Sequence, residues 1–140
     1  MAGGGLYGTV VDYLRFSRMV LGGELEGTRV LRSESVCTMA ANHIGDLTPS
    51  GWKTANPLYS NDVDLGTGQE FGLSFLINSV TTPAGRAPGS MMWGGLANTY
   101  YWIDPSSQVA GVFATQVLPF FDGPALDACL ALERTVYASL

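Results

Sequence analysis

The sequence is poor in charge, in histidine and cysteine, and in long apolar runs. Of its 140 residues 14% are charged, one is histidine, two are cysteine, and Lys53 is the single lysine. A net charge of −5 with so few cations argues against nucleic acid or an anionic membrane as a partner. No apolar run approaches the roughly 20 residues that a membrane-spanning helix needs. One histidine and two scattered cysteines cannot form a convincing zinc cluster. We therefore expect no metal, cofactor, nucleic-acid or membrane partner.

The start of the chain carries no recognisable targeting segment. Residues Met1–Gly5 contain neither the positive segment nor the apolar core of a signal peptide, so the localisation stays open, with the cytoplasm as the default. The glycine run leads almost directly into a helical pattern, which is more typical of the middle of a domain than of its beginning. Cys37 and Cys129 each lie in an apolar helical pattern, which favours buried free thiols over a disulfide or a metal site.

Two amphipathic helices are expected early in the chain. Thr9 is the expected N-cap of a helix over Val10–Leu21, with Asp12 placed for a capping box. Ser33 is expected to cap a second helix over about Glu34–Asn42. The apolar spacing of both segments predicts that one side of each helix packs on a core.

A third helix is expected at the end of the chain. Asp122 or Gly123 is the expected cap, and Pro124 suits the first turn. The 3.6-residue period predicts a buried stripe on this helix, made of Leu126, Cys129, Leu130, Val136, Tyr137 and Leu140.

The middle of the chain predicts an antiparallel sheet. Aromatic and β-branched residues indicate three strands in a meander, over Phe71–Val80, Met91–Ile103 and Gln108–Val117. Glycine and proline mark a long loop over 45–68 and a hairpin loop over 81–89. Apolar residues on both faces of the last two strands predict helices on both sides of the sheet. The expected fold class is α+β, an antiparallel sheet flanked by helices.

Two short patterns resemble a nucleophile and its helpers. Ser50 three residues before Lys53 would place a hydroxyl beside an amine if the segment were helical. Tyr59 and Asn61 could supply a proton shuttle and a substrate anchor. Gly51 disfavours such a helix, so a structural interpretation of both patterns is preferred over a catalytic one.

His43 has a structural interpretation and a functional one. It lies just past the second predicted helix, where the helix dipole favours a protonated imidazole. That structural role is preferred over a catalytic one.

The stretch Trp93–Gly94–Gly95 is the strongest candidate for a site. Two adjacent glycines let the backbone approach another group closely, although strand glycines are also common at plain bulges. The longer run Trp-Gly-Gly-Leu-Ala-Asn-Thr-Tyr-Tyr-Trp-Ile-Asp-Pro, residues 93–105, resembles the third-motif strand of the serine β-lactamase-related hydrolases. More narrowly, it is similar to the class C β-lactamase-like family VIII carboxylesterases. Other segments fit the same family in order and spacing: Gly4–Thr9, Asp12–Phe16, Gly22–Gly27, Asn42–His43, Phe71–Phe75 and Thr115–Phe120.

The resemblance implies a role for each residue of the third motif. Trp93 stands where β-lactamases have the Lys or His of Lys-Thr-Gly, and Gly94 and Gly95 take the second and third places. The missing cation favours uncharged esters over β-lactams. Leu96, directly after the triad, would offer its backbone N–H to the oxyanion, a donor that stabilises the tetrahedral intermediate.

The resemblance also implies that residues 1–140 are a single partial domain. In this family the Ser-x-x-Lys helix and the Tyr-x-Asn loop both precede the glycine loop on which this chain opens. We therefore expect the C-terminal portion of a serine hydrolase that cleaves carboxylic esters through an acyl-serine, and expect this chain to be inactive alone. Its expected partners are a small ester and either the missing N-terminal half or a second copy. The alternatives are a non-catalytic binding or structural module of the same fold, and a miniature active site built on Ser50, Lys53 and Tyr59.

Overall fold

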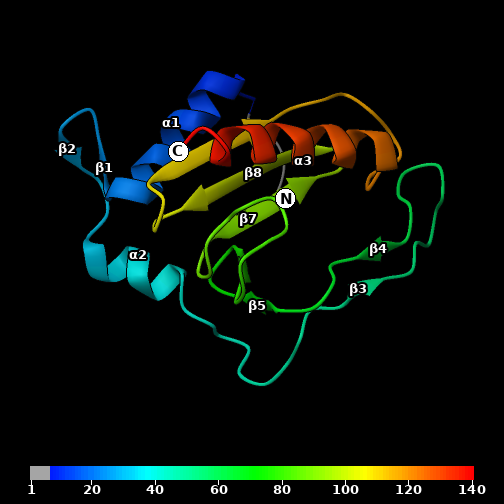
Figure 1. The fold of residues 1–140 in the computed structure, drawn as a ribbon, viewed down its shortest axis with the longest axis horizontal. Helices are drawn as coiled ribbons and strands as arrows, with labels where there is room; N and C mark the ends of the chain where they lie inside the picture. The colour runs from blue at the N-terminus through cyan, green and yellow to red at the C-terminus, as the bar shows by residue number, and fades with distance from the viewer. Residues whose placement is uncertain (1–6) are drawn as a thin grey trace.

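A five-stranded antiparallel sheet forms the centre of the computed structural model, which describes residues 7–140 (Figure 1). The strands lie side by side in chain order, so the sheet is a simple meander. Their bounds are β5 Gln69–Phe71, β6 Leu76–Asn78, β7 Met91–Gly95, β8 Thr99–Asp104 and β9 Val109–Phe113. The predicted α+β class is confirmed. Most of the predicted glycine loop lies outside the described residues.

The predicted strand Met91–Ile103 is in fact a hairpin. A turn over residues 96–98 separates β7 from β8, and the two strands pair antiparallel on either side of it. Asn98 has φ +55°, a left-handed conformation that asparagine adopts more easily than most residues. Asn98 and Thr99 are the only strongly polar interruption of a long apolar and aromatic run, so the pattern predicted one continuous strand.

The other two predicted strands are also shorter than expected. Of the predicted Phe71–Val80, only Phe71, the last residue of β5, and Leu76–Asn78 of β6 are strand, and Ser74 between them has φ +78°. Gln108–Val117 begins one residue late and ends at Phe113. Beyond it the Thr115 hydroxyl donates to the Asn98 carbonyl at 3.2 Å, which draws the chain away from the strand ladder.

The first predicted helix is confirmed and the second is shorter than predicted. Helix α1, Val10–Gly22, begins with the expected capping box between Thr9 and Asp12. Helix α2 covers Ser33–Met39, and its N-cap is Arg32, which makes no side-chain cap, so the assignment of Ser33 as cap was wrong. Past its end the Asn42 side chain bonds the Ile44 N–H and the Gly45 carbonyl, both at 2.9 Å. Such local bonds compete with helix continuation.

The last predicted helix is confirmed as α3, Gly123–Tyr137, with Asp122 as the N-cap accepting from Ala125 N–H at 3.0 Å. Its buried residues differ from the expected stripe. Cys129 is buried as predicted, but Leu130 and Leu140 are exposed, and the unpredicted Ala125 and Glu133 are buried. The apolar period therefore located the helix but missed the charged residue on its inner face.

Each face of the sheet carries helices, as predicted (Figure 1). On one face, Val20 of α1 joins Phe75, Ile77, Met91 and Ile103 in the buried core, and α2 packs against this core through residues such as Val36 and Met39. On the other face lies α3, whose Tyr137 hydroxyl donates to Asp104 of β8 at 2.9 Å. Neither cysteine forms a disulfide, but Cys37 is exposed rather than buried because α2 turns it away from the core that Val36 contacts.

The predicted loop over 45–68 contains one small hairpin, β3 Gly51–Trp52 with β4 Val63–Asp64. A second small hairpin, β1 Glu24–Leu25 with β2 Thr28–Arg29, follows α1. Within residues 7–140 no helix is both long and apolar enough to cross a membrane.

Gly111 of β9 is required by a close aromatic approach. A Cβ built there would lie 2.2 Å from Cζ2 of Trp102, a residue that is only 2% exposed and therefore has little room to shift. We predict that Gly111→Ala lowers the free energy of unfolding by about 1–3 kcal/mol, the usual cost of overpacking. Gly95→Ala is the matched control, since its Cβ would meet nothing closer than the Thr99 carbonyl at 3.8 Å. Urea denaturation measures both, and equal stability of the two variants would contradict the prediction.

Candidate functional site

The turn between β7 and β8 places Leu96 at an exposed position. The Gly95 carbonyl accepts from Asn98 N–H at 3.0 Å, and Asn98 is left-handed. A three-residue hairpin loop with these features is typically a type I turn followed by a left-handed residue. Leu96 occupies the first central position of that turn, where the turn itself makes no use of the N–H. Leu96 as a whole residue is 57% exposed, so the predicted donor belongs to a residue at the surface.

Asn98 holds this turn in place from beneath. It is fully buried, and its amide donates to the carbonyls of Val117 at 3.0 Å and Pro119 at 2.8 Å. Its side-chain oxygen accepts from the Tyr100 hydroxyl at 2.8 Å and from Asp122 N–H at 3.0 Å. Both donors and the acceptor are thus fully used. The turn is tied to the segment before α3 and to the N-cap of that helix.

Tyr100 contributes to this network as a neutral donor. Burial is the largest cause that raises its pKa, to about 12. Its ring also lies across Gly94, where a Cβ would come within 2.7 Å of the Tyr100 ring carbons. The predicted substrate residue Gly94 is therefore a glycine for a structural reason in addition to any functional one.

The strand that carries the third motif has a partly open edge. β6 pairs only with Met91 and Met92 of β7, so among the described residues Trp93, Gly94 and Gly95 have a strand partner on the β8 side alone. The Trp93 ring packs edge-on against Phe71 with centroids 5.3 Å apart. This edge is the backbone that a bound substrate could reach.

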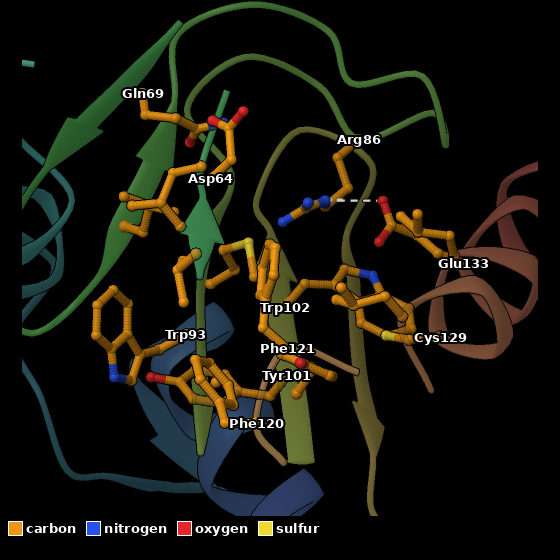
Figure 2. Close-up of a pocket in the computed structure, with 18 of the residues that line it drawn as sticks. Asp64, Gln69, Arg86, Trp93, Tyr101, Trp102, Phe120, Phe121, Cys129 and Glu133 are labelled. Atoms are coloured by element: carbon orange, nitrogen blue, oxygen red, sulfur yellow. Dashed lines mark hydrogen bonds and ion pairs between the residues drawn. The ribbon is translucent and has the colours of Figure 1, made fainter. Parts of the chain in front are cut away.

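Trp93 and Gly94 line a cavity of about 310 Å³ (Figure 2). It lies between β7 and β8, the β3–β4 hairpin and the inner side of α3, and most of its walls are aromatic or aliphatic. Gly95 and Leu96 do not line it. The structure thus places two of the four predicted site residues on the cavity wall and the other two at the adjoining turn.

The opposite end of the cavity is polar. Arg86 Nε donates to Glu133 Oε1 at 2.8 Å, and the two side chains are 10% and 4% exposed. Cys129 lies nearby on α3, and burial is the largest cause that raises its pKa, to about 11, so its thiol stays protonated and is a poor nucleophile at neutral pH. Sequence reasoning gave no role to Arg86 or Glu133; the one signal was Glu133 at the i+4 position from Cys129 on an apolar stripe.

The Ser50 and Lys53 pattern does not form a nucleophile pair of the expected kind. The segment is not helical: β3 covers only Gly51–Trp52, and Gly51 has φ +111°, so the helical spacing that would bring Ser50 beside Lys53 is absent. The Lys53 amine donates to Asp62 at 2.7 Å, and this hydrogen bond raises the pKa of Lys53. A general base needs the opposite shift.

The Tyr59 and Asn61 pattern has a structural role. Asn61 donates from its backbone to the Phe120 carbonyl at 2.9 Å and from its side chain to the Phe121 carbonyl at 3.1 Å. Phe120 N–H donates back to the Tyr59 carbonyl at 2.8 Å. These contacts hold the loop against the segment that Asn98 also binds.

His43 is likewise explained by structure. Its ring Nε2 lies 2.6 Å from the Thr38 carbonyl near the end of α2, and its backbone N–H donates to the Phe71 carbonyl at 2.9 Å. These are the contacts of a residue that closes a helix end, as the structural interpretation of His43 predicted. No group of three or more potential metal ligands gathers anywhere within residues 7–140.

An antiparallel sheet between helical layers, with a tight turn directly after a Trp-Gly-Gly strand, defines a protein of the β-lactamase and transpeptidase-like fold. The family model described as Beta-lactamase matches residues 1–133. The chain therefore belongs to the Beta-lactamase family, a family of hydrolases, and the resemblance found in the sequence is confirmed at that level.

Curated relatives are much longer than this chain. Protein Rv1367c and the uncharacterized protein MT1414, both from Mycobacterium tuberculosis, are each 35% identical over 126 residues. The match covers 84% of this chain and 29% of either relative. The chain thus spans less than a third of their length.

Three solved structures share the fold. Simvastatin synthase LovD from Aspergillus terreus has a TM-score of 0.70 at 19% identity, with 91% of this chain and 33% of that one covered. EstCE1, a hydrolase with promiscuous acyltransferase activity, has a TM-score of 0.67 at 22% identity, with 93% and 30% covered. A penicillin-binding protein homolog from Caulobacter crescentus has a TM-score of 0.63 at 16% identity, with 91% and 30% covered.

The Asn98 network predicts a large loss on truncation. Asn98→Gly keeps the left-handed backbone but leaves buried groups of Tyr100 and Asp122 without their partner, at about 1–3 kcal/mol for each group left unsatisfied. We expect Asn98→Gly to lose at least about 2 kcal/mol of unfolding free energy, and Asn98→Ala about 1 kcal/mol more for backbone strain.

Asn42→Ala is the matched control, because Asn42 is exposed and bonds only its neighbours. Chemical denaturation should show a loss below about 1 kcal/mol for this variant. If Asn98→Gly proved as mild as Asn42→Ala, the buried network would not hold the turn.

Proposed function

We propose that this chain forms one wall of an acyl-transfer site in a serine hydrolase that acts on carboxylic esters. In this proposal Leu96 N–H donates to the oxyanion, and Trp93, Gly94 and Gly95 bind the substrate beside it. The nucleophile comes from a Ser-x-x-Lys segment outside these 140 residues. The acyl group passes from the ester oxygen to that serine, the alcohol leaves with the serine's proton, and water then cleaves the acyl-serine to release the acid.

The observation that carries the proposal is the position of Leu96. Its N–H stands at a turn position that makes no internal use of it, next to the open edge of β7 and beside the Trp93 end of an apolar cavity. A preorganised backbone donor of this kind stabilises charge that develops in the transition state. The buried Asn98 fixes the turn, so the donor needs no reorganisation during the reaction.

Two further features support ester chemistry. Trp93 replaces a cation with an apolar ring, which suits an uncharged acyl group better than an anionic lactam. One protein of the same fold, EstCE1, is described as a hydrolase with promiscuous acyltransferase activity. That description agrees with acyl transfer as the chemistry of this cleft.

A proline at Leu96 tests the donor alone. Proline is favoured at the first central position of a type I turn and lacks an N–H, and the preceding Gly95 is already extended. In the polypeptide that unites this chain with its Ser-x-x-Lys segment, we expect Leu96→Pro to lower kcat about 10²–10³-fold with little change in KM.

Leu96→Ala keeps the N–H and is the matched control, expected to retain kcat within about threefold, an energy difference of less than 1 kcal/mol. Chromogenic ester hydrolysis measures both variants. An unchanged kcat for a folded Leu96→Pro enzyme would remove Leu96 from the mechanism.

The purified 140-residue chain is expected to hydrolyse no ester above the buffer rate. Ser50→Ala should leave that rate unchanged, because Ser50 lies beside a short strand and Lys53 is bound to Asp62. Turnover by the chain alone that Ser50→Ala abolishes would overturn the assignment. Upstream coding sequence provides an independent check: Ser-x-x-Lys followed by Tyr-x-Asn supports the proposal, and their absence favours a non-catalytic module.

A further inference from the structure

The cavity beside Trp93 reaches from the open edge of β7 to the inner side of α3. Trp93 and Gly94 belong to its wall at the strand edge, and Leu126 belongs to its wall on α3. Figure 2 shows Arg86 and Glu133 at the end away from Trp93. Their side chains are 10% and 4% exposed, so this end is closed toward solvent. A molecule bound at the open edge of β7 therefore meets a pocket that is closed at its far end.

The charges around the cavity disfavour an anionic occupant. Three charged residues line it: Asp64, Arg86 and Glu133. Arg86 is paired with Glu133 at 2.8 Å, whereas Asp64 is exposed and forms no ion pair within residues 7–140. A carboxylate in the cavity would lose its hydration without gaining a free cation as a partner. An ammonium would gain little from Asp64, because ion pairs at exposed carboxylates are weak.

The remaining walls suit a flexible apolar chain. Aliphatic side chains come from three elements: Leu76 of β6, Met92 of β7 and Leu126 of α3. All three tryptophans of the chain line the cavity as well. The volume of about 310 Å³ is at the lower end for ligand pockets, so the occupant is small. An uncharged alkyl group fits both the walls and the volume.

The position of the cavity relative to Leu96 favours the acyl part of an ester over the alcohol. Gly94 precedes Leu96 by two residues, about 7 Å along an extended strand. A carbonyl at the Leu96 N–H can therefore extend a chain of several carbons past Gly94 into the cavity. The acyl group stays bound through both steps, whereas the alcohol must leave while the acyl-serine occupies the strand edge. A pocket closed at its far end would trap an alcohol, so it suits the acyl chain.

We propose that this cavity is the acyl-chain pocket of the hydrolase, that it selects uncharged alkyl acyl groups of medium length, and that Leu126 sets the length that fits. This inference rests on the proposed function, because it names the acyl group on which that function acts. Each methylene that enters the cavity leaves water, which strengthens binding by up to about fourfold. The preference needs no hydrogen bond to the chain.

Hydrolysis of 4-nitrophenyl esters measures this preference in the polypeptide that unites this chain with its Ser-x-x-Lys segment. With the leaving group constant, kcat/KM should rise at least about tenfold from acetate to hexanoate and fall again at decanoate, which exceeds the pocket. A parallel series of alkyl acetates, from ethyl to hexyl, should vary by less than about threefold, because the alcohol stays in water. A steeper dependence on the alcohol than on the acyl chain would overturn the proposal.

Two substitutions at Leu126 should move the chain-length profile in opposite directions. Leu126→Trp fills the pocket, so hexanoate should lose at least about tenfold in kcat/KM relative to acetate. Leu126→Ala enlarges the pocket, so the best acyl chain should become longer. If Leu126→Trp fails to fold, Leu126→Ala still tests the proposal.

Leu132→Trp and Leu132→Ala are the matched controls. Leu132 lies on the same helix, is 40% exposed and is not part of the cavity wall, so its variants should keep the original profile. If folded Leu126 variants also kept that profile, another part of the longer polypeptide would fill the cavity and the proposal would be wrong.

Binding by the 140-residue chain separates this inference from the proposed function. Because all three tryptophans line the cavity, an alkyl bromide held there should quench their fluorescence. The uncharged probe 6-bromohexan-1-ol should quench saturably, and 6-bromohexanoate should bind at least about tenfold more weakly. Saturable quenching without ester hydrolysis by the longer polypeptide would overturn the proposed function, and with it the acyl assignment. Hydrolysis with neither saturable quenching nor a chain-length preference would overturn the pocket alone.

Discussion

The hydrogen-bond network of Asn98 is the constraint on which the site depends. One buried amide joins the β7–β8 turn, the segment around Pro119 and the start of α3. The Asn98 side chain satisfies buried hydrogen-bonding groups that would otherwise need water. The turn can therefore be tight while its outer side stays exposed. The position of Leu96 depends directly on this network, whereas the open edge of β7 follows from its short pairing with β6 and the Trp93 ring is held by Phe71.

The same arrangement separates rigid from accessible parts of the molecule. The core on the α1 and α2 face contains Met91 and Ile103, so the far ends of β7 and β8 are locked, while the near end protrudes as a turn. On the α3 face, the buried ion pair of Arg86 and Glu133 lies at one end of a largely apolar cavity.

The sequence predicted the fold class, the first and last helices, the meander and the family, because these depend on periodicity, caps and a long, ordered set of matching segments. It missed the hairpin inside Met91–Ile103, since the left-handed Asn98 is one polar residue in an apolar run and its partners lie about 20 positions away. It missed Glu133 for a similar reason: burial of a charge depends on Arg86, 47 positions earlier in the chain. Trp93, Gly94, Gly95 and Leu96 were chosen by resemblance, and their roles stay predictions. The Ser50 and Tyr59 patterns failed because strand and loop geometry separate groups that a helix would join.

The central claim is that Leu96 N–H binds the oxyanion. A crystal structure of the longer polypeptide, with its serine trapped by an alkyl phosphonate ester, tests this most directly. The account predicts the phosphoryl oxygen within about 2.7–3.1 Å of the Leu96 nitrogen, with the alkyl group toward Trp93. A phosphoryl oxygen held by other donors, with Leu96 N–H facing solvent, would contradict it.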